Sequence, residues 1–174
     1  MIRRRDVLFS AALAVVASTS VPSVAHAQKL VLLVRHAERA DGGPAAGGML
    51  SSADPGLSDA GKARANHLAA LLRDAGLTAI ISTELRRTQE TAAPLADRLK
   101  LPVMVVPGAD TAALHAKLQA EHADGIVLVV GHSNTIPAIV QRLGGPAVRI
   151  AENDYDKLLV LVPATGALTT LRYE

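Results

Sequence analysis

Residues 31–43, VLLVRHAERADGG, join an apolar run to a charged pair. The first four residues have the continuous aliphatic character of a strand that is buried on both faces of a sheet. Arg35 and His36 follow at once, and the loop after them is rich in small and polar residues. We therefore expect a central strand whose carboxyl end carries a guanidinium and an imidazole. An Arg-His pair also occurs by chance, so its meaning depends on what other segments bring to the same place.

Short aliphatic runs of the same kind alternate with longer amphipathic segments along the chain. Together with the first strand, the expected strands lie at 29–35, 79–82, 103–106, 126–130, 158–162 and 167–173. The expected helices lie at 58–75, 83–100, 111–123 and 135–143. Ser58 and Asp110 are good N-caps for the first and third helices. This order predicts an α/β fold, a three-layer αβα arrangement with a mostly parallel central sheet and a terminal β-hairpin.

The first 27 residues are expected to be a cleaved export signal, which leaves one domain at residues 28–174. Three arginines at positions 3–5 precede an apolar run at 7–17, and Ala-His-Ala at 25–27 has the small-x-small form of a cleavage site. The apolar run is too short for a permanent membrane-spanning helix. The arginines fit the general secretory and the twin-arginine routes equally well. We therefore expect a periplasmic or secreted protein.

Charge and composition argue against nucleic-acid binding and against a covalent anchor. The chain has 18 basic and 16 acidic residues, and removal of the signal's three arginines and one aspartate leaves 15 of each. A chain of near-zero net charge lacks the basic surface that nucleic-acid binding needs. No cysteine is present, which excludes a lipoprotein anchor and disulfides.

Two motifs resemble known sites but are incomplete. Residues 56–63, GLSDAGKA, approach a phosphate-binding P-loop, but no strand precedes them and Ala63 lacks the hydroxyl that would hold magnesium. Residues 131–135, GHSNT, approach the nucleophile elbow of an α/β-hydrolase with Ser133 as nucleophile. No histidine follows His132, although the hydrolase triad runs serine, acid, histidine. A serine esterase is therefore the runner-up enzyme class.

Residues with basic side chains, arginine and histidine, follow three of the expected strands. Arg35 and His36 follow the first, residues 83–87 (TELRR) the second, and residues 131–134 (GHSN) the fourth. Ligands of parallel sheets gather at the carboxyl ends of the strands. Two histidines with two or three arginines form a pocket for a doubly charged oxyanion, most simply a phosphoryl group. The two histidines have no apparent third metal ligand, so no metal or other cofactor is expected.

Four segments in order, RHAE, LSDAGKARA, STELRRTQETA and VVGHSNT, resemble the motifs of the histidine phosphatase superfamily, which is also called phosphoglycerate mutase-like. The resemblance runs from about Lys29 to the C-terminus. It implies that His36 is the nucleophile, that Arg35 and Arg87 bind the phosphoryl group, and that His132, protonated, assists them. Arg86 falls outside the motif. Asn134 is a further candidate for substrate binding.

The family resemblance also implies an acid that protonates the leaving group, and here the match is weaker. Many relatives take a glutamate from an insertion after the third strand, where this chain has only a short loop. Asp110 and Glu84 are the candidates, and Asp110 serves equally well as an N-cap. With neither as the acid, we expect a preference for good leaving groups such as phosphoramidates or aryl phosphates.

The sequence therefore predicts an exported, metal-independent phosphatase that hydrolyses a small phosphomonoester through a phosphohistidine. Mutase activity is not expected, because a mutase needs a more enclosing pocket. The non-enzymatic alternative is a phosphate- or polyanion-binding protein that kept the pocket and lost turnover. Residues 40–56 are either a solvated linker or a flexible wall over the site.

Overall fold

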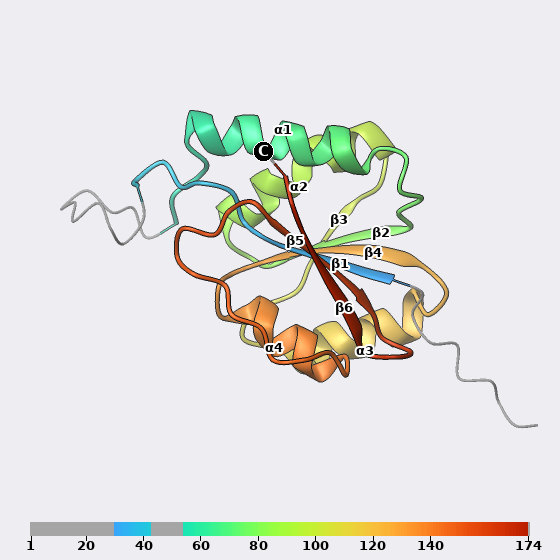
Figure 1. The fold of residues 1–174 in the computed structure, drawn as a ribbon. Coiled ribbons are helices and arrows are strands. Elements are labelled where there is room, and N and C mark those ends of the chain that lie inside the picture. The colour runs from blue at the N-terminus through green and yellow to red at the C-terminus, as the bar shows by residue number, and fades with distance from the viewer. Residues whose placement is uncertain (1–29, 43–53, 174) are drawn as a thin grey trace, which may run out of the picture.

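A computed structural model describes residues 30–42 and 54–173 of the chain (Figure 1). The expected export signal at residues 1–27 lies outside the described residues, and so does most of the loop expected at 40–56. The stems of that loop are joined by a β-bridge between Arg39 and Leu57 and by a hydrogen bond from the backbone N–H of Ala40 to the carbonyl of Gly56.

A single sheet of six strands forms the middle of the molecule. Its strands are β1 (Leu30–Arg35), β2 (Ala79–Ser82), β3 (Val103–Val105), β4 (Ile126–Gly131), β5 (Lys157–Val162) and β6 (Ala167–Arg172), in the order β3-β2-β4-β1-β5-β6. The first four in that order are mutually parallel, whereas β5 runs antiparallel to both β1 and β6. The predicted mostly parallel sheet and terminal β-hairpin are therefore confirmed.

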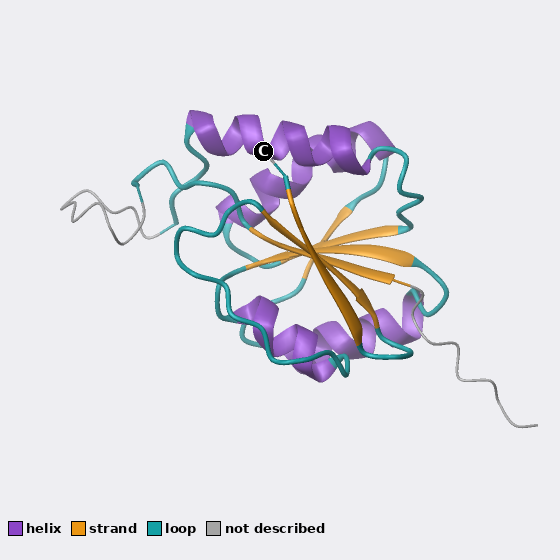
Figure 2. Cartoon of the chain, in the orientation of Figure 1, coloured by secondary structure: helices purple, strands orange, loops and turns teal. Residues whose placement is uncertain are grey.

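Helices cover both faces of the sheet and complete three layers (Figure 2). They are α1 (Asp59–Leu72), α2 (Arg86–Leu99), α3 (Thr111–Glu121) and α4 (Thr135–Arg142). Helices α1 and α2 pack on one face, and α3 and α4 on the other (Figure 1). None of the helices in the described ranges has the length and apolar character that a bilayer span requires.

The core consists of two layers because successive strand residues point to opposite faces. In β1, Val31 and Leu33 belong to the cluster under α3 and α4, while Leu32 and Val34 belong to the cluster under α1 and α2. All four are at most 5% exposed. Burial of such a side chain stabilises the fold by roughly 1.5–3 kcal/mol. The continuous aliphatic run thus forms a strand with two buried faces, as its sequence predicts.

Helix α2 begins at Arg86, three residues later than expected. Leu85 is its N-cap and is extended, with φ −77° and ψ 141°, and its side chain cannot cap the helix. The carboxylate of Asp54 accepts the hydrogen bond from the Arg86 backbone N–H instead, at 3.0 and 3.1 Å. The residues between β2 and α2 therefore form a turn that leaves Glu84 at the end of the sheet.

The segment that approaches a P-loop is the start of an ordinary helix. The Ser58 hydroxyl accepts a hydrogen bond from the Gly61 N–H at 3.1 Å, and the Lys62 ammonium pairs with Asp59. A Cβ atom on Gly61 would lie 2.3 Å from the carbonyl oxygen of Glu38. A glycine is therefore needed at position 61, because the first turn of α1 packs closely against the backbone of Glu38.

Candidate active site

The candidate site lies at the carboxyl ends of β2, β4 and β1, which are neighbours in the sheet. The pairing is in register, so that Val130 of β4 lies beside Val34 of β1 and beside Ser82 of β2, and Arg35 lies beside Gly131. The residues that follow these strands therefore start at one level. This places Arg35, His36, His132 and the turn before α2 at a single edge, as expected from the sequence.

His36 is buried, with 2% of its surface exposed, and its ring orientation is fixed by the backbone. Its Nδ1 lies 2.8 Å from the carbonyl oxygen of Ala37. A carbonyl oxygen only accepts, so Nδ1 carries the hydrogen and Nε2 holds the lone pair. The hydroxyl of Thr91 accepts a hydrogen bond from the Ala37 N–H at 3.0 Å and holds this turn against α2.

The protonation state of His36 suits a nucleophile. Burial is the main reason why the pKa of His36 falls from 6.5 to about 3. The hydrogen bond to Ala37 opposes this shift, and the charges of Arg35 and Arg87 add to it. His36 is therefore neutral at every pH above about 4, with its Nε2 lone pair available.

His132 lies beside His36, with ring centroids 5.3 Å apart and planes inclined by 64°. Burial, with the charge of Arg87 as the next cause, lowers the pKa of His132 from 6.5 to about 4. His132 is therefore neutral near pH 7 in the free protein, because burial among arginines disfavours a further cation. The expected protonation of His132 beside a bound phosphoryl group stays a prediction. A bound dianion would act in the opposite direction and raise this pKa.

Arg35 is held by a segment that sequence reasoning did not assign to the site. Its guanidinium donates from Nη1 to the carbonyl of Ala151 and from Nη2 to the carboxylate of Glu152, both at 2.9 Å. The Tyr155 ring stacks over it, 4.3 Å from Cζ to the ring centroid. This segment precedes β5, and β5 runs antiparallel beside β1, so its start lies at the carboxyl end of β1.

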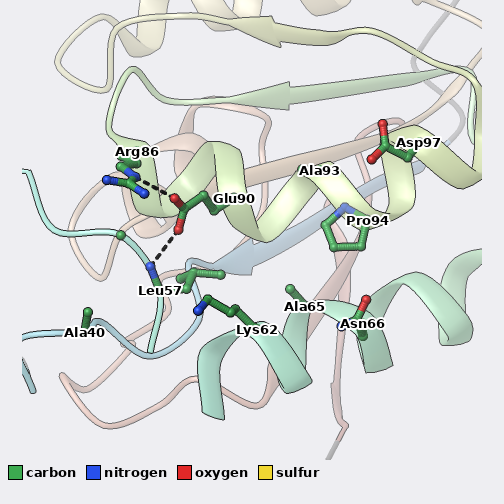
Figure 3. Close-up of a pocket in the computed structure, with 11 residues that line it drawn as sticks. Ala40, Leu57, Lys62, Ala65, Asn66, Arg86, Glu90, Ala93, Pro94 and Asp97 are labelled. Atoms are coloured by element: carbon green, nitrogen blue, oxygen red, sulfur yellow. Dashed lines mark hydrogen bonds and ion pairs between the residues drawn. The ribbon is translucent and has the colours of Figure 1, made fainter. Parts of the chain in front are cut away.

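Arg87 and Arg86 face different surroundings. The Arg87 side chain is 11% exposed, and its charge, with that of Arg35, acts on His36. The Arg86 side chain is 67% exposed and pairs with Glu90. Arg86 and Glu90 line a separate cavity of about 690 Å³ between α1 and α2, where Glu90 also accepts from the Leu57 N–H (Figure 3).

Three unsatisfied buried nitrogens belong to the residues that surround His36. Within residues 30–42 and 54–173, Arg35 Nε, Arg87 Nε and His132 Nε2 are among the buried side-chain atoms without a hydrogen-bond partner. A buried donor without an acceptor is costly. Two guanidiniums with unused donors, beside an imidazole nitrogen without a partner, suit an anion that has several acceptor oxygens, such as a phosphoryl group.

The two candidate acids, Asp110 and Glu84, both accept hydrogen bonds from backbone N–H groups. The Asp110 carboxylate accepts from the Ala113 N–H at 2.8 Å and caps α3. Hydrogen bonds from its own backbone N–H and from that of Gly108 lower the pKa of Glu84. The Glu84 carboxylate lies near His132 and Arg87, whose charges lower that pKa further. Glu84 is therefore an ionised group at the edge of the site.

The two residues after His132 differ in their contacts. The Ser133 hydroxyl donates to Glu152 at 2.6 Å, whereas a serine esterase needs it on a histidine. Asn134 is exposed and is the N-cap of α4, without a side-chain capping hydrogen bond. Across the described part of the chain, no three His, Cys, Asp or Glu side chains cluster as metal ligands.

Comparisons with known proteins agree on family and fold. The family model of the histidine phosphatase superfamily (branch 1) matches residues 31–110. The search of curated proteins found no match. Similar solved structures include an α-ribazole-5′-phosphate phosphatase candidate from Escherichia coli, with 18% identity, coverage of 84% of this chain and 96% of that one, and a TM-score of 0.63.

Two other similar structures contain oxyanions. One is a protein histidine phosphatase in complex with tungstate, with 20% identity, coverage of 83% and 95%, and a TM-score of 0.61. The other is a mycobacterial glucosyl-3-phosphoglycerate phosphatase in complex with inorganic phosphate, with 18% identity, coverage of 84% and 95%, and a TM-score of 0.59. At this level of identity they establish a shared fold.

Proposed function

Because the chain belongs to the histidine phosphatase superfamily, we propose that it is a phosphatase that hydrolyses a phosphomonoester through a phosphohistidine on His36. One observation carries this proposal. The neutral His36 ring, with Nδ1 committed to Ala37, belongs to one site with three unsatisfied buried nitrogens of Arg35, Arg87 and His132. Two proteins of the same fold form complexes with phosphate and with tungstate, which supports an oxyanion as the ligand.

The reaction has two displacements at phosphorus. First the Nε2 lone pair of His36 forms a bond to phosphorus while the ester P–O bond breaks, and the leaving oxygen takes a proton from solvent water. Water then attacks the phosphohistidine, the P–N bond breaks, the attacking water gives one proton back to the solvent, and inorganic phosphate leaves. Arg35, Arg87 and His132 donate hydrogen bonds to the non-bridging oxygens as charge shifts among them. The lone pair returns to His36, which is ready for the next cycle.

Turnover of p-nitrophenyl phosphate by the purified protein in EDTA tests this function. We expect turnover that survives the chelator. Corrected for ionisation of the substrate, kcat/KM should change little between pH 7 and pH 5, because the pKa of the free nucleophile is about 3. For a histidine at its ordinary pKa of 6.5, the neutral fraction would fall roughly thirtyfold by pH 5, and kcat/KM would fall with it. Phosphate binding without any turnover would instead favour the non-catalytic binding protein.

We also propose that the protein is exported and acts in the periplasm or outside the cell. The support is the N-terminal pattern of three arginines, an apolar run and Ala-His-Ala at residues 25–27. Expression of the full chain followed by fractionation and intact mass measurement should find a periplasmic product that begins at Gln28. A cytoplasmic product that retains residues 1–27 would contradict the proposal.

A further inference from the structure

Carboxylates accompany every arginine of the candidate site. Glu152 pairs with Arg35 at 2.9 Å, and two further pairs repeat the arrangement: Arg39 with Asp41, and Arg87 with Asp54 at 3.9 Å. The charges of Arg39, Asp41 and Asp54 all act on Arg87, so these groups belong to its electrostatic surroundings. Glu84 is the fourth carboxylate, anchored by the Gly108 N–H at 2.7 Å.

The formal charges of these groups indicate which substrates they favour. Both histidines are neutral at pH 7. The three guanidiniums and four carboxylates named above therefore sum to a net charge of −1 before any substrate binds. The loop at residues 43–53 adds nothing, because its sequence has no ionisable side chain. A phosphate dianion makes the balance −3. Any further negative charge on the leaving group would therefore be repelled, and a positive charge would be attracted.

Two of the carboxylates flank His132 and are exposed at the surface. Glu84 comes from the turn between β2 and α2, and Glu152 comes from the segment before β5. The charges of both act on His132. Each is fixed in place, Glu84 by Gly108 and Glu152 by Arg35 and by the Ser133 hydroxyl at 2.6 Å. An ester alcohol bound beside His132 would therefore be within the field of both carboxylates.

We propose that the substrate is a phosphorylated amino alcohol, whose ammonium group is recognised by Glu84 and Glu152. This proposal rests on the phosphatase activity proposed above and specifies its substrate class. A cationic substituent also lowers the pKa of the alcohol that leaves, since it stabilises the alkoxide. A leaving alcohol of lower pKa has less need of an acid. This matters here because Glu84 is ionised and Asp110 caps a helix.

A pair of substrates with the same shape tests the proposal. Phosphocholine and 3,3-dimethylbutyl phosphate differ only in the exchange of a quaternary nitrogen for carbon. Their kcat/KM ratio therefore reports the effect of the positive charge on leaving-group pKa and on recognition together, and the change of this ratio in a Glu variant reports recognition alone. We expect phosphocholine to be favoured roughly tenfold at low ionic strength, and less at high salt. Glu84→Gln and Glu152→Gln should each lower the ratio about threefold or more. Glu121→Gln, at the C-terminal end of α3 where Glu121 pairs with Lys117, should leave it unchanged.

Because the ratio compares two substrates on one protein, a general loss of activity in a variant does not affect it. p-Nitrophenyl phosphate separates the two proposals, since failure to hydrolyse it counts against the phosphatase function itself. Hydrolysis of the aryl phosphate with a phosphocholine ratio of one or less would overturn the substrate class alone. So would a preference for 2-phosphoglycolate, whose leaving group carries a carboxylate.

Discussion

Replacement of His36 by alanine should lower the turnover of p-nitrophenyl phosphate by about a thousandfold or more, with phosphate binding weakened only a few fold. Alanine supplies no lone pair to attack phosphorus, so the covalent route is lost. The donors on Arg35, Arg87 and His132 remain, and they are the groups proposed to bind the oxyanion. The variant should therefore separate chemistry from binding.

His115→Ala is the matched control for this substitution. His115 is partly buried on α3 and is not among the groups whose charges act on His36, and we expect its loss to leave kcat within about twofold. Wild-type protein quenched in alkali during turnover should carry the mass of one phosphoryl group, and His36→Ala should not. His36→Asn guards against misfolding of the alanine variant. Near-normal turnover by both folded variants would rule out His36 as the nucleophile.

Arg87→Gln should lower kcat/KM by about a hundredfold to a thousandfold, because it removes one preorganised cation from the developing charge on the phosphoryl group. Arg86→Gln makes the same chemical change one residue earlier and should stay within about twofold. Arg86 is exposed and pairs with Glu90 at the other cavity, whereas Arg87 is buried with a free Nε. The adjacent pair thus provides its own control.

The Arg87 comparison needs kcat and KM measured separately, together with a thermal melt of each variant. We expect both variants to fold and phosphate to inhibit Arg87→Gln much less strongly than it inhibits the wild type. Equal, small effects of the two substitutions would show that Arg87 does not contact the phosphoryl group. A larger effect of Arg86→Gln would move the binding site to the cavity between α1 and α2.

Much of the fold could be predicted from the chain because its strands are short aliphatic runs with clear ends. The run before Arg35 and the run before His132 both form central strands, and Ser58 and Asp110 cap helices as their residue types suggest. The predicted start of α2 was three residues too early. The first N–H group of the helix donates to the carboxylate of Asp54, which is distant in sequence. Local patterns carry no information about such a partner.

The candidate site was predictable where a residue directly follows a parallel strand, as Arg35, His36 and His132 do, or where it falls on a family motif, as Arg87 does. Glu152 and Tyr155 lie before β5, and nothing local places that segment beside Arg35; the antiparallel pairing of β5 with β1 does. The charge state of His132 depends on burial and on Arg87, which are properties of the folded protein. Composition likewise predicts equal numbers of basic and acidic residues after removal of the signal. It cannot predict that four carboxylates lie near the arginines of the site, because the fold brings them together.

The six-residue pairing of β1 with β4 also bears on how the protein comes apart. His36 and His132 follow these two central strands, so they can separate only when the middle of the sheet opens, which costs close to the full free energy of unfolding. Glu152 and Tyr155 belong to an irregular segment, and opening of such a segment costs much less. On gentle warming or in dilute denaturant, discrimination between substrates should therefore fade first. Hydrolysis should fall in part, because Arg35 loses its partners, while His36 and His132 stay together.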